Sequence, residues 1–269
     1  QVMKLCLMAC VLLSIAIKSL AGYEYLTTIT IFACSVFLLA PLFGRDHGKQ
    51  GDWIKFSFLT FSLCMIGFIF ALSLHASMRG DSIFSGLQNI YHQDVQRRTY
   101  GDSSQFDPVY RASLESSFFD VLNTYWSNWN TPLSMFIPGS YLGGLFGIFL
   151  IGMVYEALTR RRVSYGGPAM VFVFFAATVS WFFLAKAHSY IHTHLNYVLW
   201  YFGFVQALLY CLARFLLLVS LDILKLFKRL NFTQVIISGS VVLLFIAVGP
   251  ARYIDNRMAV ITSGVVEPI

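Results

Sequence analysis

The chain has 269 residues, of which 57% are hydrophobic and only 12% are charged, with a mean hydropathy of +0.68. Soluble domains carry about 25% charged residues, so this composition excludes an ordinary soluble protein and predicts an integral membrane protein. The net charge of +6 does not predict a nucleic-acid partner, because the basic residues fall on alternate connections between apolar runs.

Seven apolar runs are each long enough to cross the roughly 30 Å hydrocarbon core of a bilayer as a helix. In chain order they cover residues 4–21, 26–43, 54–74, 138–157, 168–185, 195–219 and 233–250. We expect the first run to be a retained helix, although its lysine and apolar stretch also fit a signal peptide. The runs are apolar on all sides, whereas barrel strands alternate with period two, so we predict an all-α membrane helix bundle.

Positive charges set the expected orientation of this bundle. They gather at the second, fourth and sixth connections, as Arg45, Lys49 and Lys55, then Arg160, Arg161 and Arg162, then Lys225, Lys228 and Arg229. By the positive-inside rule the N-terminus is cytoplasmic and the C-terminus is outside. The expected organisation is helices one to three in 1–74, a large outer loop in 75–137, helices four to seven in 138–250, and an outer tail in 251–269.

The outer loop ends in a segment with helical periodicity. Its apolar residues recur at three- and four-residue spacing, as Leu114, Phe118, Val121, Leu122 and Tyr125 after Val109. This stripe, followed by Trp126 and Trp129, predicts an amphipathic helix at the outer membrane interface. A helix that caps the bundle without touching lipid is the alternative.

Two features inside the apolar runs predict packing. Gly139, Gly143 and Gly147 open the fourth run at four-residue intervals, and small residues at this spacing let helices approach closely in lipid, which offers a surface to a protein partner. Glu156 and Arg214 lie near the inner ends of two runs, where we expect them to pair or to reach water.

The segment KAHSYIHTHLNYVLWY, residues 186–201, concentrates polar and aromatic residues between two apolar runs. On a helix that begins near His188, three of them, His188, His192 and Asn196, would share one face. The first interpretation is a phosphate site formed by Lys186, His188, His192 and Asn196 with Arg97 and Arg98 of the outer loop.

Two other interpretations of this segment stay open. A divalent metal such as zinc could be held by His188, His192 and His194, and no other cofactor is expected. Alternatively the residues are structural, since His, Tyr and Trp are ordinary residues of the membrane interface. For a reaction at this face, one of four outer-loop aspartates would act as the general base, namely Asp81, Asp94, Asp102 or Asp107.

The layout of several spans, a large outer loop with an interface helix, and polar aromatic residues at the outer helix ends resembles the polyprenyl-phosphate-dependent glycosyltransferases of the multi-spanning C type. Members of that superfamily generally carry a catalytic acid in the first outer loop. Here that loop, around AGYEY, is a few residues long with Glu24 as its only acid, and the large loop follows the third run. The resemblance therefore transfers no catalytic residue.

Our hypothesis is a bacterial inner-membrane protein whose outer face acts on a lipid-linked, phosphate-bearing glycan precursor, with membrane lipid and a polyprenyl-phosphate carrier as partners. The inner loops are too short for a nucleotide-binding domain, and the chain has no Gly-rich phosphate loop, which fits a carrier lipid as donor. The alternatives are a non-catalytic membrane subunit or scaffold and an outer-face metal-dependent enzyme.

Overall fold

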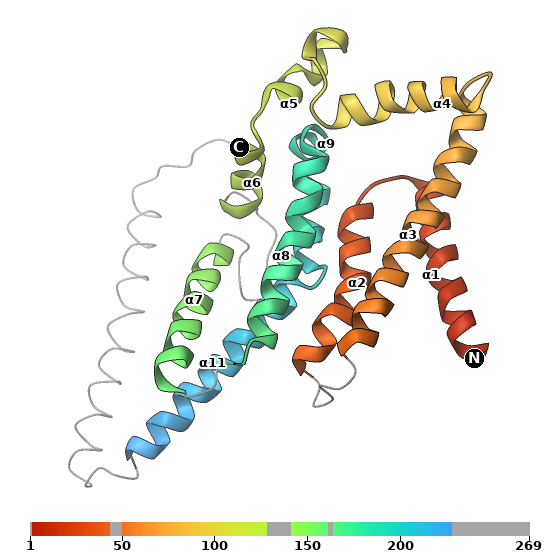
Figure 1. Cartoon of the computed structure of the whole chain (residues 1–269). Coiled ribbons are helices and arrows are strands. Elements are labelled where there is room, and N and C mark those ends of the chain that lie inside the picture. Colours follow the sequence, from red (N-terminus) through yellow and green to blue (C-terminus); the bar gives the residue numbers. More distant parts are fainter. Residues whose placement is uncertain (1, 44–49, 128–140, 161–163, 228–269) are drawn as a thin grey trace, which may run out of the picture. The chain divides into compact units, whose positions relative to one another are not determined.

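The computed structural model describes residues 2–43, 50–127, 141–160 and 164–227 (Figure 1). Within this part every regular element is a helix, which confirms the all-α prediction. Residues 1–215 form one compact unit, and all contacts below lie inside it. The second unit, from Leu216, is described only for the end of the last helix.

Five helices of the described part are long and apolar enough to cross a membrane, which supports an integral membrane protein. They are α2 (Leu26–Phe43), α3 (Gln50–Arg79), α7 (Leu142–Thr159), α8 (Gly166–Leu184) and α11 (Phe204–Phe227). The first predicted run corresponds to α1 (Val2–Ala21), whose apolar stretch Leu5–Ala21 is shorter. The seventh run, 233–250, lies outside the described residues, as do Gly139 and the tail 251–269.

Helix α3 organises the N-terminal part of the unit, because it packs against both α1 and α2. At Gly67 the approach to α1 is so close that an added Cβ would lie 2.8 Å from the carbonyl oxygen of Leu12. Its 30 residues correspond to about 45 Å of helix. This is more than the roughly 30 Å apolar core requires, so its last turns carry polar residues beyond that core.

The long connection after α3 is built from short helices. They are α4 (Ile83–Ile90), the π-helix η2 (Tyr91–Gln96), the 3-10 turns η3 (Ser103–Gln105) and η4 (Pro108–Tyr110), α5 (Arg111–Glu115) and α6 (Phe118–Ser127). A reciprocal cap between Ser82 and Ser85 starts α4, which turns away from α3 (Figure 1). Gly86 allows α4 to touch the backbone of α3 at Ala76.

The predicted amphipathic helix over 109–125 is not one continuous helix. It is divided into α5 and α6 at Ser116 and Ser117, because Ser117 and Asp120 cap a new helix with mutual hydrogen bonds of 2.9 and 3.1 Å. Of its apolar side chains, Leu114, Val121 and Tyr125 are buried, since α5 packs on α9 and α6 packs on α7, α8 and α9, whereas Val109 is exposed. The buried part of the stripe packs on the bundle, and its position at the membrane interface stays a prediction.

The main core lies around α8, which contacts α2, α6, α9 and η6. Large aromatic side chains dominate it, with Tyr125, Phe182 and Trp200 almost completely buried. Tyr125 and Phe182 stack at 4.2 Å between ring centroids. The pairing expected for Glu156 and Arg214 is confirmed: they bind at 2.5 Å and connect α7 to α11. Of the glycines on α7, Gly143 faces Trp126, whereas Gly147 has open space around it.

The predicted sixth run does not form one helix from residue 195. After α8 the chain forms α9 (Lys186–Ile191), α10 (Thr193–Asn196) and the 3-10 helix η6 (Tyr197–Tyr201), and α11 begins only at Phe204. Two residues cause the breaks: His192 leaves helical geometry at φ −101° and ψ 45°, and Gly203 has φ +95°. At Gly203 the ring of Phe174 also leaves no space for a Cβ. The histidines and Asn196 therefore do not share one continuous helix face.

We predict that Gly86→Ala destabilises the protein. A methyl group there would collide with the carbonyl oxygen of Ala76, and such overpacking costs about 1–3 kcal/mol. The matched control is Gly144→Ala on α7, where an added Cβ has no neighbour within 4 Å. The midpoint of thermal unfolding in detergent should fall for Gly86→Ala and hold or rise for Gly144→Ala. Equal midpoints would show that the helix crossing at Gly86 is not close.

Candidate functional site

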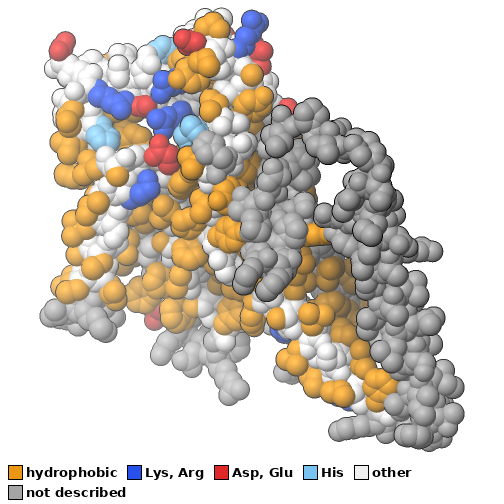
Figure 2. All heavy atoms as spheres, turned by 180° about the vertical axis from the view of Figure 1, so that it is seen from behind, with side chains coloured by type: hydrophobic (Ala, Val, Ile, Leu, Met, Phe, Trp, Pro, Cys, Tyr) orange, Lys and Arg blue, Asp and Glu red, His pale blue; other side chains and the backbone are white. Residues whose placement is uncertain are grey.

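Charged side chains from three distant segments meet at the ends of the apolar helices. Arg98 donates to Glu24 at 2.8 Å and lies 3.7 Å from Asp94, while Asp94 also pairs with Arg79. Glu24 comes from the connection between α1 and α2, and Arg79 ends α3. Figure 2 shows charged and histidine side chains gathered at one end of the described surface, above a mostly hydrophobic region.

Aromatic and histidine side chains extend this network. The hydroxyl of Tyr23 lies 2.6 Å from Nδ1 of His75, and burial raises the pKa of Tyr23. On the other side of the network, His188 interacts electrostatically with Arg98 and Glu24. Its ring centroid lies 4.5 Å from that of His192. We call the whole group the polar cluster; it comprises Tyr23, Glu24, His75, Arg79, Asp94, Arg98, His188 and His192.

One acid of the polar cluster, Glu24, is held in charged form by its surroundings. Burial opposes the charge on Glu24, but hydrogen bonds from its own backbone and from Arg98 outweigh it and lower its pKa. Asp94 sits between two guanidinium groups with 15% of its side chain exposed. It belongs to the π-helix η2, a rare distortion that is frequent at functional sites.

His188 differs from the charged members because it is neutral at physiological pH. Burial, then the neighbouring His192 and Arg98, lower its pKa to about 4. Its ring also meets the edge of Trp181 at a centroid distance of 6.0 Å. A neutral imidazole can accept a proton or a hydrogen bond, but it does not supply a positive charge to a phosphate.

Beneath the polar cluster runs a chain of buried hydrogen bonds. Tyr25 donates to Oδ1 of Asn196 at 2.7 Å, and the Asn196 amide donates to Ser189 at 3.4 Å. Tyr125 donates to the Ser189 carbonyl at 2.7 Å, and the indole of Trp200 donates to the Tyr125 carbonyl at 3.2 Å. This chain ties the α1–α2 connection and α6 to the segment between α8 and α11.

Tyr25 reaches this chain from a rare backbone conformation. Its φ of 62° is unusual for a residue with a side chain, and its ring packs edge-on against Trp181 at 5.4 Å. Because Asn196 is completely buried and its amide already serves Tyr25 and Ser189, it holds the fold in this structure. Its predicted contact with a phosphate stays a prediction that would require the chain of hydrogen bonds to open.

Lys186 is also engaged by the protein itself. Its ammonium group donates to the carbonyl oxygens of Leu114 and Ser116, each at 2.6 Å, and lies 5.1 Å from the ring centroid of Tyr100. Burial lowers the pKa of this lysine. The two carbonyls belong to the end of α5, so Lys186 fastens α5 to α9 at the point where the backbone leaves helical geometry.

The remaining predicted residues separate into different environments. The guanidinium carbon of Arg97 lies 5.2 Å from the ring centroid of Tyr110. Asp102 and Asp107 cap the exposed turns η3 and η4, and Asp81 is exposed. Of the four predicted aspartates, only Asp94 belongs to the polar cluster.

The metal interpretation finds little support among the described side chains. Nowhere in the described ranges do three His, Cys, Asp or Glu side chains gather closely enough to hold a metal ion. His188 and His192 are neighbours, but the side chain of His194 lies outside the described part. The three-histidine site stays a prediction.

Two members of the polar cluster, Tyr23 and Glu24, were not predicted as site residues. They lie in the short connection after the first run, and His75 and Arg79 carry no motif. Their place in the chain was the signal that could have found them, because alternate connections of a helix bundle lie on the same side of the membrane. No protein-family model, curated protein or solved structure matches the chain.

We predict that Lys186→Met destabilises the protein by about 2–5 kcal/mol, because two carbonyls would lose their charged donor in a buried place. Lys55→Met is the control, since the side chain of Lys55 is 80% exposed. Thermal unfolding of both variants in the same detergent provides the measurement. A Lys186 variant as stable as the Lys55 variant would contradict the role given to this ammonium group.

We predict that His188 makes stability depend on pH. Its folded pKa of about 4 lies below the ordinary histidine value of about 6.5, so the unfolded chain binds more protons between these values. The contribution of neutral, buried His188 to the free energy of unfolding is therefore complete above about pH 6.5 and is lost as the pH falls toward 4. Unfolding midpoints measured across this range should fall less steeply in His188→Gln than in the wild type. Parallel curves would show that His188 titrates normally in the folded protein.

Proposed function

We propose that the chain is a membrane enzyme that transfers a sugar from a lipid-linked, phosphate-bearing donor at the polar cluster. The observation that carries this proposal is the pair of partly exposed guanidinium groups, Arg79 at 41% and Arg98 at 32%, on either side of Asp94 at the ends of apolar helices. Guanidinium groups bind phosphate with two parallel hydrogen bonds, and a lipid brings its phosphate to this depth of the membrane.

The balance of charge in the polar cluster supports such a role. In this structure two guanidinium groups face two carboxylates, Asp94 and Glu24, so every strong charge has a partner. A donor phosphate competes with the carboxylates for Arg79 and Arg98. The displaced carboxylate of Asp94 is then available to accept the proton of the acceptor hydroxyl.

The reaction follows from these roles. The acceptor oxygen forms a bond to the anomeric carbon of the sugar while the bond from that carbon to the phosphate oxygen breaks. The hydroxyl proton passes to Asp94. The leaving lipid phosphate takes the electron pair of the broken bond and with it a second negative charge, which Arg79 and Arg98 stabilise.

Binding of farnesyl phosphate to the purified protein in detergent tests this function. We expect Arg98→Gln and Arg79→Gln each to weaken binding by roughly 10-fold or more, because a hydrogen bond to a charged group contributes about 1.5–3 kcal/mol. Arg111→Gln is the matched control, since its guanidinium is 71% exposed and pairs with Glu115 outside the polar cluster. Absence of binding by the wild type, or equal losses in all three variants, would overturn the proposal.

The second candidate is a non-catalytic membrane subunit. Two observations favour it. Lys186 and Asn196 form hydrogen bonds within the protein itself, and the surface of α7 at Gly144 and Gly147 has open space in which a partner could pack. If this is the function, Gly147→Leu should change the oligomeric state or the co-purifying proteins, and Arg98→Gln should leave assembly unchanged. The farnesyl phosphate measurement and this assembly measurement separate the two functions.

A further inference from the structure

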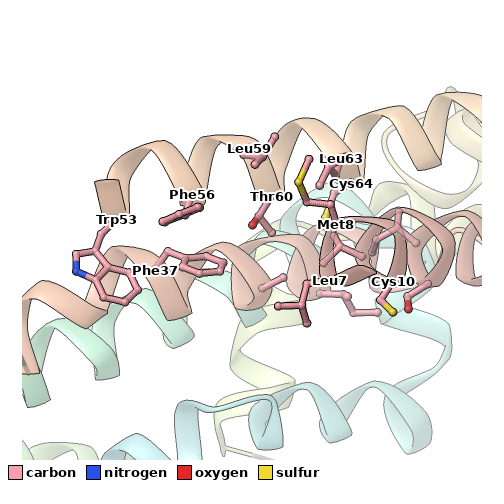
Figure 3. A pocket seen from close by; sticks show the side chains of 15 residues that line it. Leu7, Met8, Cys10, Phe37, Trp53, Phe56, Leu59, Thr60, Leu63 and Cys64 are labelled. Atoms are coloured by element: carbon pink, nitrogen blue, oxygen red, sulfur yellow. The ribbon is translucent and has the colours of Figure 1, made fainter. Parts of the chain in front are cut away.

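A groove of about 640 Å³ lies between the first three helices (Figure 3). Residues of α1 and α2 line its two sides and residues of α3 complete it, among them Leu7, Phe37, Phe56 and Leu63. Its polar groups are the hydroxyls of Ser14 and Thr60, the thiols of Cys10 and Cys64, and the indole N–H of Trp53 at one end. The lining offers no charge and few hydrogen bonds, so it suits a hydrocarbon rather than a polar ligand.

The size of this groove indicates that something occupies it. Folded interiors are packed closely and have few voids larger than a water molecule, whereas ligand pockets measure about 300–1,000 Å³. The groove falls in the range of ligand pockets. Its residues on α2 and α3 belong to helices that are apolar over membrane-spanning lengths, and those on α1 lie in a shorter apolar stretch, so we take the surrounding medium to be lipid hydrocarbon.

The length of the groove matches one leaflet of a bilayer. On α3 it extends from Trp53 to Cys64, which are 11 positions apart. At 1.5 Å per residue this is about 16 Å, close to half of the roughly 30 Å hydrocarbon core. Trp53 stands at one end, and the charged side chains of Asp52 and Lys55 beside it are exposed. Tryptophan followed by exposed charges is the usual marker of the lipid headgroup level.

This position separates the groove from the polar cluster. Arg79 follows Cys64 by 15 positions, or about 22 Å along the helix, so the polar cluster lies beyond the opposite end of the groove. An acyl chain from that opposite leaflet spans only about 15 Å, half of the core, so it reaches no farther than the Cys64 end of the groove. The occupant must therefore enter from the leaflet at the Trp53 end.

We propose that the groove is a binding site for one acyl chain of a glycerophospholipid from the leaflet at the Trp53 end. The lipid's headgroup lies near Trp53 and Lys55, and its chain runs between α1 and α2 toward Cys64. This bound lipid replaces the direct helix packing that is missing between α1 and α2 in the groove. It is independent of the proposed sugar transfer, which takes place at the other end of α3.

Quantification of lipid that remains bound after detergent exchange tests this inference. The protein is purified, washed in a detergent free of lipid, extracted with organic solvent and analysed by mass spectrometry. We expect about one phospholipid per chain in the wild type, because a chain enclosed on three sides exchanges slowly. Filling the groove from either wall, with Ala33→Phe on α2 or Ser14→Phe on α1, should lower this amount at least fivefold.

The matched controls place the same side chain on the same helices outside the groove. Val36→Phe on α2 and Leu13→Phe on α1 replace exposed side chains that do not line it, so they should retain the lipid. Equal retention in groove and control variants would overturn the inference. A wild type without phospholipid, or with a polyprenyl lipid in its place, would overturn it without any variant.

Discussion

Where the backbone leaves helical geometry next to a membrane, its N–H and C=O groups lose their helical hydrogen bonds and must find partners inside the protein. The rest of this structure depends on that constraint. Between α9 and α11 the chain leaves helical geometry twice, at His192 and at Gly203, and each break frees backbone groups that a continuous helix would satisfy. The freed groups and the buried side chains around them are then connected to other segments. Thr178 donates to the carbonyl of Leu199 at 2.9 Å, Tyr125 to that of Ser189, and Lys186 holds the end of α5. The crowding of polar and aromatic residues in this segment is largely the consequence of an interrupted helix.

The same constraint divides the polar residues into two groups with different tasks. The residues of the first group, such as Asn196 and Lys186, are buried and hydrogen-bonded to other parts of the protein, so their role is to hold neighbouring segments in place. Those of the polar cluster are partly exposed and pair with one another, so a charged ligand can exchange with them. The buried chain fixes the α1–α2 connection that presents Glu24, which is how the first group positions the second. Tyr25, held at an unusual φ next to Glu24, is the residue where the two groups meet.

The composition and the apolar runs were sufficient to predict an all-helical membrane protein, because about 20 consecutive apolar residues have few other solutions in a lipid environment. They were not sufficient where two physical preferences compete. The stripe from Leu114 to Tyr125 fits one helix by periodicity, but the cap formed by Ser117 and Asp120 starts a second one. The four-residue spacing of His188, His192 and Asn196 has meaning only on a continuous helix, and His192 itself interrupts it. The polar cluster unites residues 23–24, 75–98 and 188–192, and a single sequence contains no signal for such pairings beyond the expectation that alternate connections share a side.

The long connection also contains an exposed part with few contacts to the rest of the fold. Between Asp102 and Val109 the chain forms two single turns, each closed by an aspartate that accepts from the backbone two residues ahead, and neither turn has a buried residue. Ser103 donates to Glu115 at 2.9 Å and the ring of Phe106 lies 5.1 Å from that of His92, whereas α5 and α6 are ordered by the helices on which they pack. Surface turns of this kind tolerate inserted sequence. Because both turns are free of buried residues, this segment is the place to graft a rigid fusion domain or an antibody epitope for single-particle imaging.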